Sequence, residues 1–174
     1  NFFKPLGVTP LLINKLCETY KGAERAIKKF KENPYILAED IKGVGFLRAD
    51  EIALNYNVKP ESPFRIKSGV KHIFKEEAQN NGSTWLTIND FENRIVELLK
   101  IDLDVINNTL KEMCDDKQVF KDDDRIALQY YFDLEKKIAD KLLLLQSIPA
   151  KKYSQSSIDD GIKNTQEEQG FEFT

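Results

Sequence analysis

Apolar residues recur every three or four positions along most of this chain, which is the spacing of one buried face of an α-helix. Between residues 64 and 79, for example, Ile66, Val70, Ile73 and Phe74 fall on one such face. The spacing predicts helices over residues 10–21, 23–31, 35–40, 46–57, 64–79, 88–100, 103–113 and 132–145. The chain is therefore expected to be mainly α-helical.

Residues that start and stop helices support these boundaries. Thr9 precedes Pro10, a pair that favours a helix start, because the threonine side chain can cap the first turn and proline fits its first position. Residues 87–90 read as a capping box. The two prolines within residues 58–63 prevent any helix from continuing through that stretch. We therefore expect a domain boundary between residues 57 and 64.

The spacing changes near residue 119. Residues 119–120 and 126–128 read as two short strands joined by the acidic turn Asp122–Asp124. Three helices followed by a two-stranded β-hairpin is the element order of a winged-helix domain. We expect a helical, winged-helix-like domain over residues 64–146, followed by a polar linker over residues 147–174 that lacks periodicity.

The most informative string is Gly43-Val44-Gly45, between a short helix and the next one. Glycine lets a ligand approach the main chain closely, because it has no Cβ. The first N–H groups of the following helix lack intrahelical partners and form the positive end of the helix dipole. This is a helix-hairpin-helix pattern, which suits a phosphate group. The alternative is a structural turn between two helices that touches no ligand.

Residues 6–10 repeat this pattern incompletely, because most of the helix before Gly7 is missing. We expect residues 1–57 to form a tandem helix-hairpin-helix unit that contacts the DNA backbone. The contacts are expected from main-chain groups at the glycines, from Val44 as the wedge between the helices, and from flanking cations. The expected DNA-binding residues are Lys4, Gly7, Lys42, Gly43, Val44, Gly45 and Arg48.

Charge limits the strength of such binding. The net charge of the chain is −3, but residues 1–80 carry a net charge of +4 and residues 81–174 a net charge of −7. Affinity for DNA grows with the number of phosphates neutralised, so the chain is expected to bind DNA weakly. The acidic residues of the winged-helix-like domain, at its last helix and its β-turn, argue against binding of duplex DNA there.

Catalytic chemistry is not expected. The sequence contains no phosphate-binding loop of the Gly-x-x-x-x-Gly-Lys-Ser/Thr type, and its two cysteines have no metal-ligand spacing. The single histidine, His72, is expected on a solvent-facing side of its helix with Ser68, Lys75 and Gln79. Asp122–Asp124 is interpreted as an exposed turn rather than a cation site. No catalytic residue, cofactor site or metal site is therefore assigned.

Cellular location follows from what the sequence lacks. It contains neither an apolar run long enough to cross a membrane nor a signal-peptide pattern, and it does not begin with methionine. Sparse, widely separated cysteines suit a reducing cytoplasm. We expect a cytoplasmic piece of a longer chain.

The sequence resembles the N-terminal region of RecD-like ATP-dependent DNA helicases, of the bacterial branch that works without RecB and RecC. Residues 33–46, NPYILAEDIKGVGF, carry the most specific part of the resemblance. It continues through Ala49-Asp50 and Ile52-Ala53, upstream through residues 7–10, and downstream through Arg65-Ile66 and Tyr130-Tyr131, covering about residues 5–146.

The resemblance implies a superfamily 1 helicase that moves 5′ to 3′ on single-stranded DNA, using ATP and magnesium, in DNA repair or recombination. ATP and Mg²⁺ would bind to motor domains after Thr174, and ATPase residues cannot be assigned within this chain. The implied partners are single-stranded or forked DNA, bound without sequence specificity, and the motor domains of the same chain.

Two other functions are open. The chain could be a protein-interaction or scaffolding module whose acidic half contacts a motor domain or a repair partner. A base-excision glycosylase also uses a Gly-apolar-Gly hairpin, but it needs a catalytic aspartate downstream, and none occurs between Ala53 and Asp90. The glycosylase is the weakest of these hypotheses.

Overall fold

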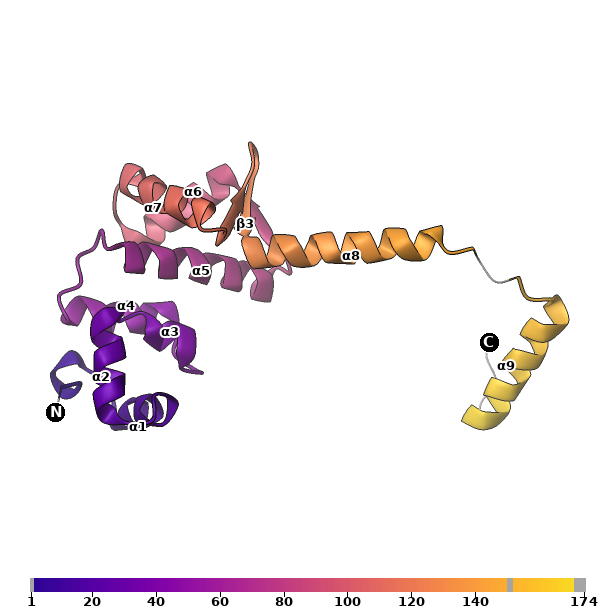
Figure 1. The fold of residues 1–174 in the computed structure, drawn as a ribbon, viewed down its shortest axis with the longest axis horizontal. Coiled ribbons are helices and arrows are strands. Elements are labelled where there is room, and N and C mark those ends of the chain that lie inside the picture. Colours follow the sequence, from indigo (N-terminus) through magenta and orange to yellow (C-terminus); the bar gives the residue numbers. More distant parts are fainter. Residues whose placement is uncertain (1, 150–151, 171–174) are drawn as a thin grey trace. The chain divides into compact units, whose positions relative to one another are not determined.

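The computed structural model describes residues 2–149 and 152–170, which form helices and one small sheet (Figure 1). In chain order the elements are the 3-10 helix η1 (Lys4–Leu6), α1 (Pro10–Thr19), α2 (Ala23–Glu32), α3 (Ile36–Asp40), α4 (Phe46–Asn55), α5 (Pro63–Asn80), β1 (Trp85–Thr87), α6 (Ile88–Leu99), α7 (Leu103–Asp115), β2 (Val119–Lys121), β3 (Arg125–Leu128), α8 (Gln129–Ser147) and α9 (Gln155–Gln169). The expected mainly α-helical fold is confirmed.

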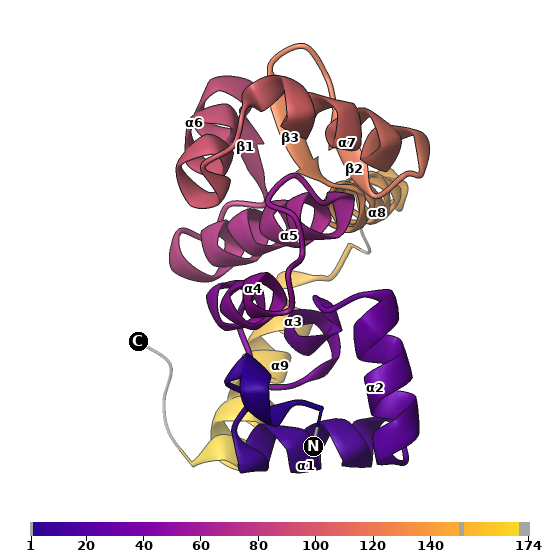
Figure 2. The ribbon, with the colours of Figure 1, turned by 90° about the vertical axis from the view of Figure 1, so that its left-hand side faces the viewer.

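The chain divides into two compact units, Asn1–Glu135 and Lys136–Thr174. Within the first unit, α5 is the middle layer: α1–α4 lie on one side of it, where α4 packs against it, and α6, α7 and the sheet lie on the other (Figures 1 and 2). The expected boundary between residues 57 and 64 coincides with the connection from α4 to α5, inside this unit.

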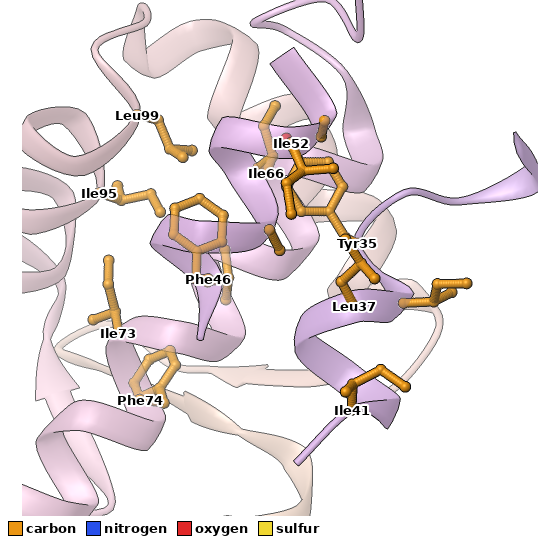
Figure 3. Packing of buried hydrophobic residues seen from close by; sticks show 14 of the residues in the cluster. Tyr35, Leu37, Ile41, Phe46, Ile52, Ile66, Ile73, Phe74, Ile95 and Leu99 are labelled. Carbon is orange, nitrogen blue, oxygen red and sulfur yellow. The ribbon is translucent and has the colours of Figure 1, made fainter. Parts of the chain in front are cut away.

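One continuous apolar core holds the first unit together. Figure 3 shows its centre, where side chains from α3 and α4 meet those of α5 and α6. The fully buried side chains at this centre are Tyr35, Leu37, Ile52, Ile66, Phe74, Ile95 and Leu99. The helical spacing of the sequence therefore identified the buried faces of α4, α5 and α6 correctly.

The sheet contains a strand that the sequence pattern missed. The expected hairpin of β2 and β3 is confirmed, but β1 pairs with the other edge of β3, giving the order β1-β3-β2 with antiparallel neighbours. Leu86 lies opposite Ile126 in the β1–β3 pair, and both are buried. Three residues are too few to show the alternation of a strand, and the helix-capping Thr87 ends β1 at once.

A buried polar network joins the helices on the two sides of α5. Arg65 of α5 donates two hydrogen bonds to the carboxylate of Asp50 of α4, at 2.8 and 2.9 Å. The hydroxyl of Tyr35 donates a third, at 2.6 Å. The Arg65 guanidinium also donates to the carbonyl oxygens of Pro60 and Leu99, at 3.1 and 2.9 Å. The buried carboxylate and guanidinium therefore both have partners.

This network makes stability sensitive to alkaline pH. Burial and the hydrogen bond to Asp50 raise the pKa of the Tyr35 hydroxyl well above its ordinary value. Above about pH 10 the unfolded chain loses this proton while the folded chain keeps it, so the contribution present below pH 10 is lost as the pH rises. We expect the free energy of unfolding, measured in urea between about pH 8 and about pH 11, to fall more steeply in the unchanged protein than in Tyr35→Phe. Equal slopes would contradict this assignment.

The second unit contains most of α8 and all of α9. On α8, the expected apolar stripe is exposed, with Leu134 at 38%, Ile138 at 58% and Leu142 at 61% of full exposure. The sequence pattern did not predict α9, which begins at the capping side chain of Ser154 within the segment expected to be a linker. In the described ranges, none of the helices is both long and apolar enough to cross a membrane.

Candidate nucleic-acid interface

The turn between α3 and α4 places a glycine in a left-handed conformation. The N–H of Val44 donates to the carbonyl oxygen of Ile41 at 3.1 Å, closing the turn, and Ile41 is buried in the core. Gly43, inside the turn, has φ = +90°. This angle is strained for residues that carry a Cβ, so the turn needs glycine at position 43.

Gly45 leaves the first turn of α4 open. It is the N-cap residue, in an extended conformation, and no side chain caps the helix. Its carbonyl oxygen accepts from the N–H of Ala49 at 3.1 Å. The N–H groups of Phe46, Leu47 and Arg48 therefore have no intrahelical acceptor. By contrast, the side chains of Thr9, Thr87 and Ser154 cap α1, α6 and α9.

The space beside Gly45 is empty of protein atoms. A Cβ built on this glycine meets no atom within 4 Å, and its φ of −86° is ordinary for any residue. Gly45 therefore serves neither packing nor backbone conformation, and what it provides is access to the main chain at the positive end of α4.

Two lysines lie at this end of the hairpin. Lys42 is exposed, and its carbonyl oxygen accepts a hydrogen bond from the ammonium group of Lys15 at 3.4 Å. Lys15 belongs to α1, and the sequence pattern gave no reason to place it beside the hairpin. The contact adds a second positive charge beside the turn between α3 and α4.

The two hairpins are joined to each other. Gly7, in a left-handed conformation with φ = +77°, ends η1 and precedes the capping Thr9 of α1. Its carbonyl oxygen accepts from Arg48 of α4 at 2.5 Å, and Arg48 also pairs with Glu51. Arg48 therefore joins the first hairpin to the second. The contact with DNA that the sequence predicts would be a second role of the same side chain.

The remaining expected site residues lie on both hairpins. Lys4 is an exposed residue of η1, on the first hairpin. Val44 is half-buried and packs against the apolar core between α3 and α4. The structure thus brings Gly7 together with Arg48, and Val44 together with Gly43 and Gly45.

The prediction for His72 holds in part. His72 shares one side of α5 with Ser68, Lys75 and Gln79, as expected, but that side lines a cleft. The His72 side chain is only 17% exposed, because its imidazole stacks on the ring of Phe46, with centroids 5.3 Å apart and planes at 22°. Its Nε2 lies 3.4 Å from a carboxylate oxygen of Glu76. The face of α5 that carries His72 forms one wall of this cleft, and residues of α3 and of the start of α4 form the other wall.

The acidic turn of the β-hairpin is held by hydrogen bonds between its own residues. The carboxylate of Asp122 accepts hydrogen bonds from the N–H groups of Asp124 and Arg125, at 3.1 and 2.7 Å, and from the Arg125 guanidinium at 2.8 Å. The hydrogen bonds from Arg125 hold the pKa of Asp122 below its ordinary value. Over residues 2–149 and 152–170, no group of three or more histidine, cysteine or acidic residues is arranged to hold a metal ion.

A comparison with known protein families matches the part of the chain that holds the hairpins and the whole of α5. Residues 1–85 match the family model described as the ATP-dependent RecD2 DNA helicase HHH domain. The match ends at Trp85 of β1, before the helices α6 and α7. It therefore covers every residue expected to contact DNA.

Proposed function

Because residues 1–85 are the HHH domain of a RecD2-like DNA helicase, we propose that they bind the DNA backbone without sequence specificity and serve the helicase as an accessory DNA-binding region. The single observation that carries this proposal is the open first turn of α4 at Gly45. Its N–H groups and helix dipole suit a phosphate oxygen, as helix N-termini do in many anion sites.

The arrangement favours contacts with phosphates over contacts with bases. Main-chain N–H groups and flexible lysines at the hairpins can position a backbone phosphate, but they carry no sequence information. Lys42 and Lys15 supply positive charge at the turn between α3 and α4, and Lys4 supplies it at the first hairpin. The small net charge of +4 over residues 1–80 agrees with weak binding.

The catalytic part of the proposal lies outside this chain. We propose that motor domains of the superfamily 1 type, linked to residue 174, hydrolyse ATP with magnesium and move 5′ to 3′ on the strand that the hairpins hold. A role in DNA repair or recombination and a cytoplasmic location belong to the same proposal. The resemblance to RecD-like helicases supports these assignments, and this sequence contains no phosphate-binding loop that would perform the hydrolysis.

A different function is proposed for the acidic half as the competing hypothesis. Residues 81–174 carry a net charge of −7, and the apolar residues of α8 are exposed. Exposed apolar residues on a charged helix are typical of protein contacts. Under this hypothesis the chain is a scaffold for the motor domains or a repair partner, and it needs no DNA contact.

Salt-dependent binding of DNA separates the two functions. We expect labelled single-stranded and forked DNA to bind the chain, with affinity that falls as salt rises. For the single strand, Lys42→Ala should make the slope of log K against log salt shallower by about 0.7, the value of one lost phosphate contact. Lys137→Ala, at an exposed lysine of α8, is the control and should leave the slope unchanged. Absence of salt-dependent binding, measured by fluorescence anisotropy, would favour the scaffold.

A further inference from the structure

A cleft of about 260 Å³ opens beside the second hairpin, between the hairpin and α5. Its walls come from α3, from the start of α4 and from the polar side of α5. The residues that line it are Ala38, Glu39, Val44, Gly45, Phe46, Ser68, Lys71, His72, Lys75, Glu76 and Gln79. Gly45 is the N-cap residue of α4, and Phe46 carries the first N–H group that has no intrahelical acceptor. The cleft therefore adjoins the proposed phosphate site.

The charges in the cleft largely cancel. Lys71 pairs with Glu39 at 2.6 Å, and the imidazole of His72 lies beside Glu76. Among the charged groups that line the cleft, Lys75 alone makes no ion pair with a described residue. Such a balanced set does not favour a phosphate inside the cleft, so its occupant is expected to be a neutral group.

The rest of the lining suits a flat group with an apolar face and a polar edge. Ala38, Val44 and Phe46 supply the apolar wall. Ser68 lines the cleft and is only 5% exposed, and its hydroxyl makes no hydrogen bond with a described residue. Because none of the fully buried side-chain polar atoms of the described residues lacks a partner, this hydroxyl is accessible from the cleft. The amide of Gln79 is likewise available. These groups can both donate and accept hydrogen bonds.

We propose that this cleft receives an unpaired nucleobase from the strand whose backbone lies on the hairpin. The volume is below that of pockets for drug-sized ligands, about 300–1,000 Å³, and suits one base rather than a longer segment. A base within a duplex is stacked and paired, so it cannot enter unless it is flipped out. The cleft therefore makes the domain prefer unpaired DNA, although it reads little sequence.

This inference rests on the proposed function, and the test separates the two. The complete 174-residue chain is titrated into a labelled oligothymidine and, separately, into an oligomer of the same length made of abasic nucleotides. Both probes carry the same phosphates, but only the first carries bases. We expect the oligothymidine to bind about tenfold more tightly, which is the size of the contribution that a single base contact makes in proteins that bind single strands.

Variants assign this difference to the cleft. Ala38→Leu fills the cleft and should bring oligothymidine binding down to the abasic level while leaving abasic binding unchanged. Ser68→Ala removes the free hydroxyl without adding volume and should reduce oligothymidine binding severalfold, which keeps the test valid if Ala38→Leu does not fold. Ala139→Leu, at an exposed alanine of α8, is the matched control and should change neither affinity.

The outcomes distinguish the failure of the nucleobase cleft from the failure of the backbone contact. Equal binding of the two probes, or an undiminished preference for oligothymidine in both cleft variants, would overturn the nucleobase cleft and leave the backbone contact standing. No salt-dependent binding of either probe would overturn the backbone contact as well, and the nucleobase cleft with it.

Discussion

Arg65→Met is expected to lower the free energy of unfolding of this protein by about 3–5 kcal/mol, because it leaves a buried carboxylate without its partner. The side chain of Arg65 is only 7% exposed and that of Asp50 is 12% exposed. Methionine fills a similar volume, so the cost comes from charge and hydrogen bonding rather than from a cavity. The loss is a large fraction of the total stability of an ordinary domain, which is about 5–15 kcal/mol.

The size of the effect follows from how many groups depend on this guanidinium. It neutralises Asp50 through two hydrogen bonds, and it satisfies the carbonyl oxygens of Pro60 and Leu99. Three elements therefore lose a polar partner at once: α4, the connection before α5, and the end of α6. A buried acceptor left without a donor costs its full desolvation penalty.

Urea unfolding followed by circular dichroism measures the loss. The matched control is Arg125→Met, which breaks an ion pair of the same kind with Asp122 at the surface, where water replaces the contact. We expect the control to change stability little. If the two variants were equally stable, the Tyr35–Asp50–Arg65 network would not be the junction between the two sides of α5.

Local signals in the sequence were sufficient to predict the helices α1 to α8 and the hairpin of β2 and β3. Helical spacing identified the buried faces, as at Ile66 and Val70 of α5. The capping threonines Thr9 and Thr87 marked the starts of α1 and α6, and both side chains accept a hydrogen bond in the structure. The string around Gly43 predicted the turn, because only a few residue types tolerate its backbone angles.

Contacts between distant segments could not be predicted in this way. Arg48 reaches Gly7 across 41 positions, and Arg65 reaches Leu99 across 34. No periodicity encodes such pairs. The contact of His72 was missed for the same reason: the polar side of α5 looks like an open solvated face in the sequence, but in the fold it forms one wall of a cleft and His72 stacks on Phe46 of α4. The hairpin was therefore predictable and the cleft beside it was not.

Gly45→Val is expected to weaken DNA binding at least tenfold while leaving the fold intact. The extended backbone at this position accepts valine, and a Cβ there meets no protein atom within 4 Å. The added side chain would instead occupy the space in front of the first turn of α4, where a phosphate would approach. Loss of one or two charge-assisted hydrogen bonds, each worth about 1.5–3 kcal/mol, accounts for a change of this size.

A glycine elsewhere in the chain provides a matched control. Gly161 of α9 also has an open environment and no positive φ. Gly161→Val therefore makes the same chemical change in the second compact unit, outside the residues that form the two hairpins. It should leave the affinity for DNA unchanged, so any general effect of valine on the chain would be detected.

The most direct test of the backbone-binding hairpin is the affinity of these two variants and of the unchanged chain for a labelled single strand at low salt, measured by fluorescence anisotropy. Our account predicts that Gly45→Val binds at least tenfold more weakly than the unchanged chain, and that Gly161→Val binds equally well. Equal binding by a folded Gly45→Val variant would contradict it, because the open first turn of α4 would then have no part in holding DNA.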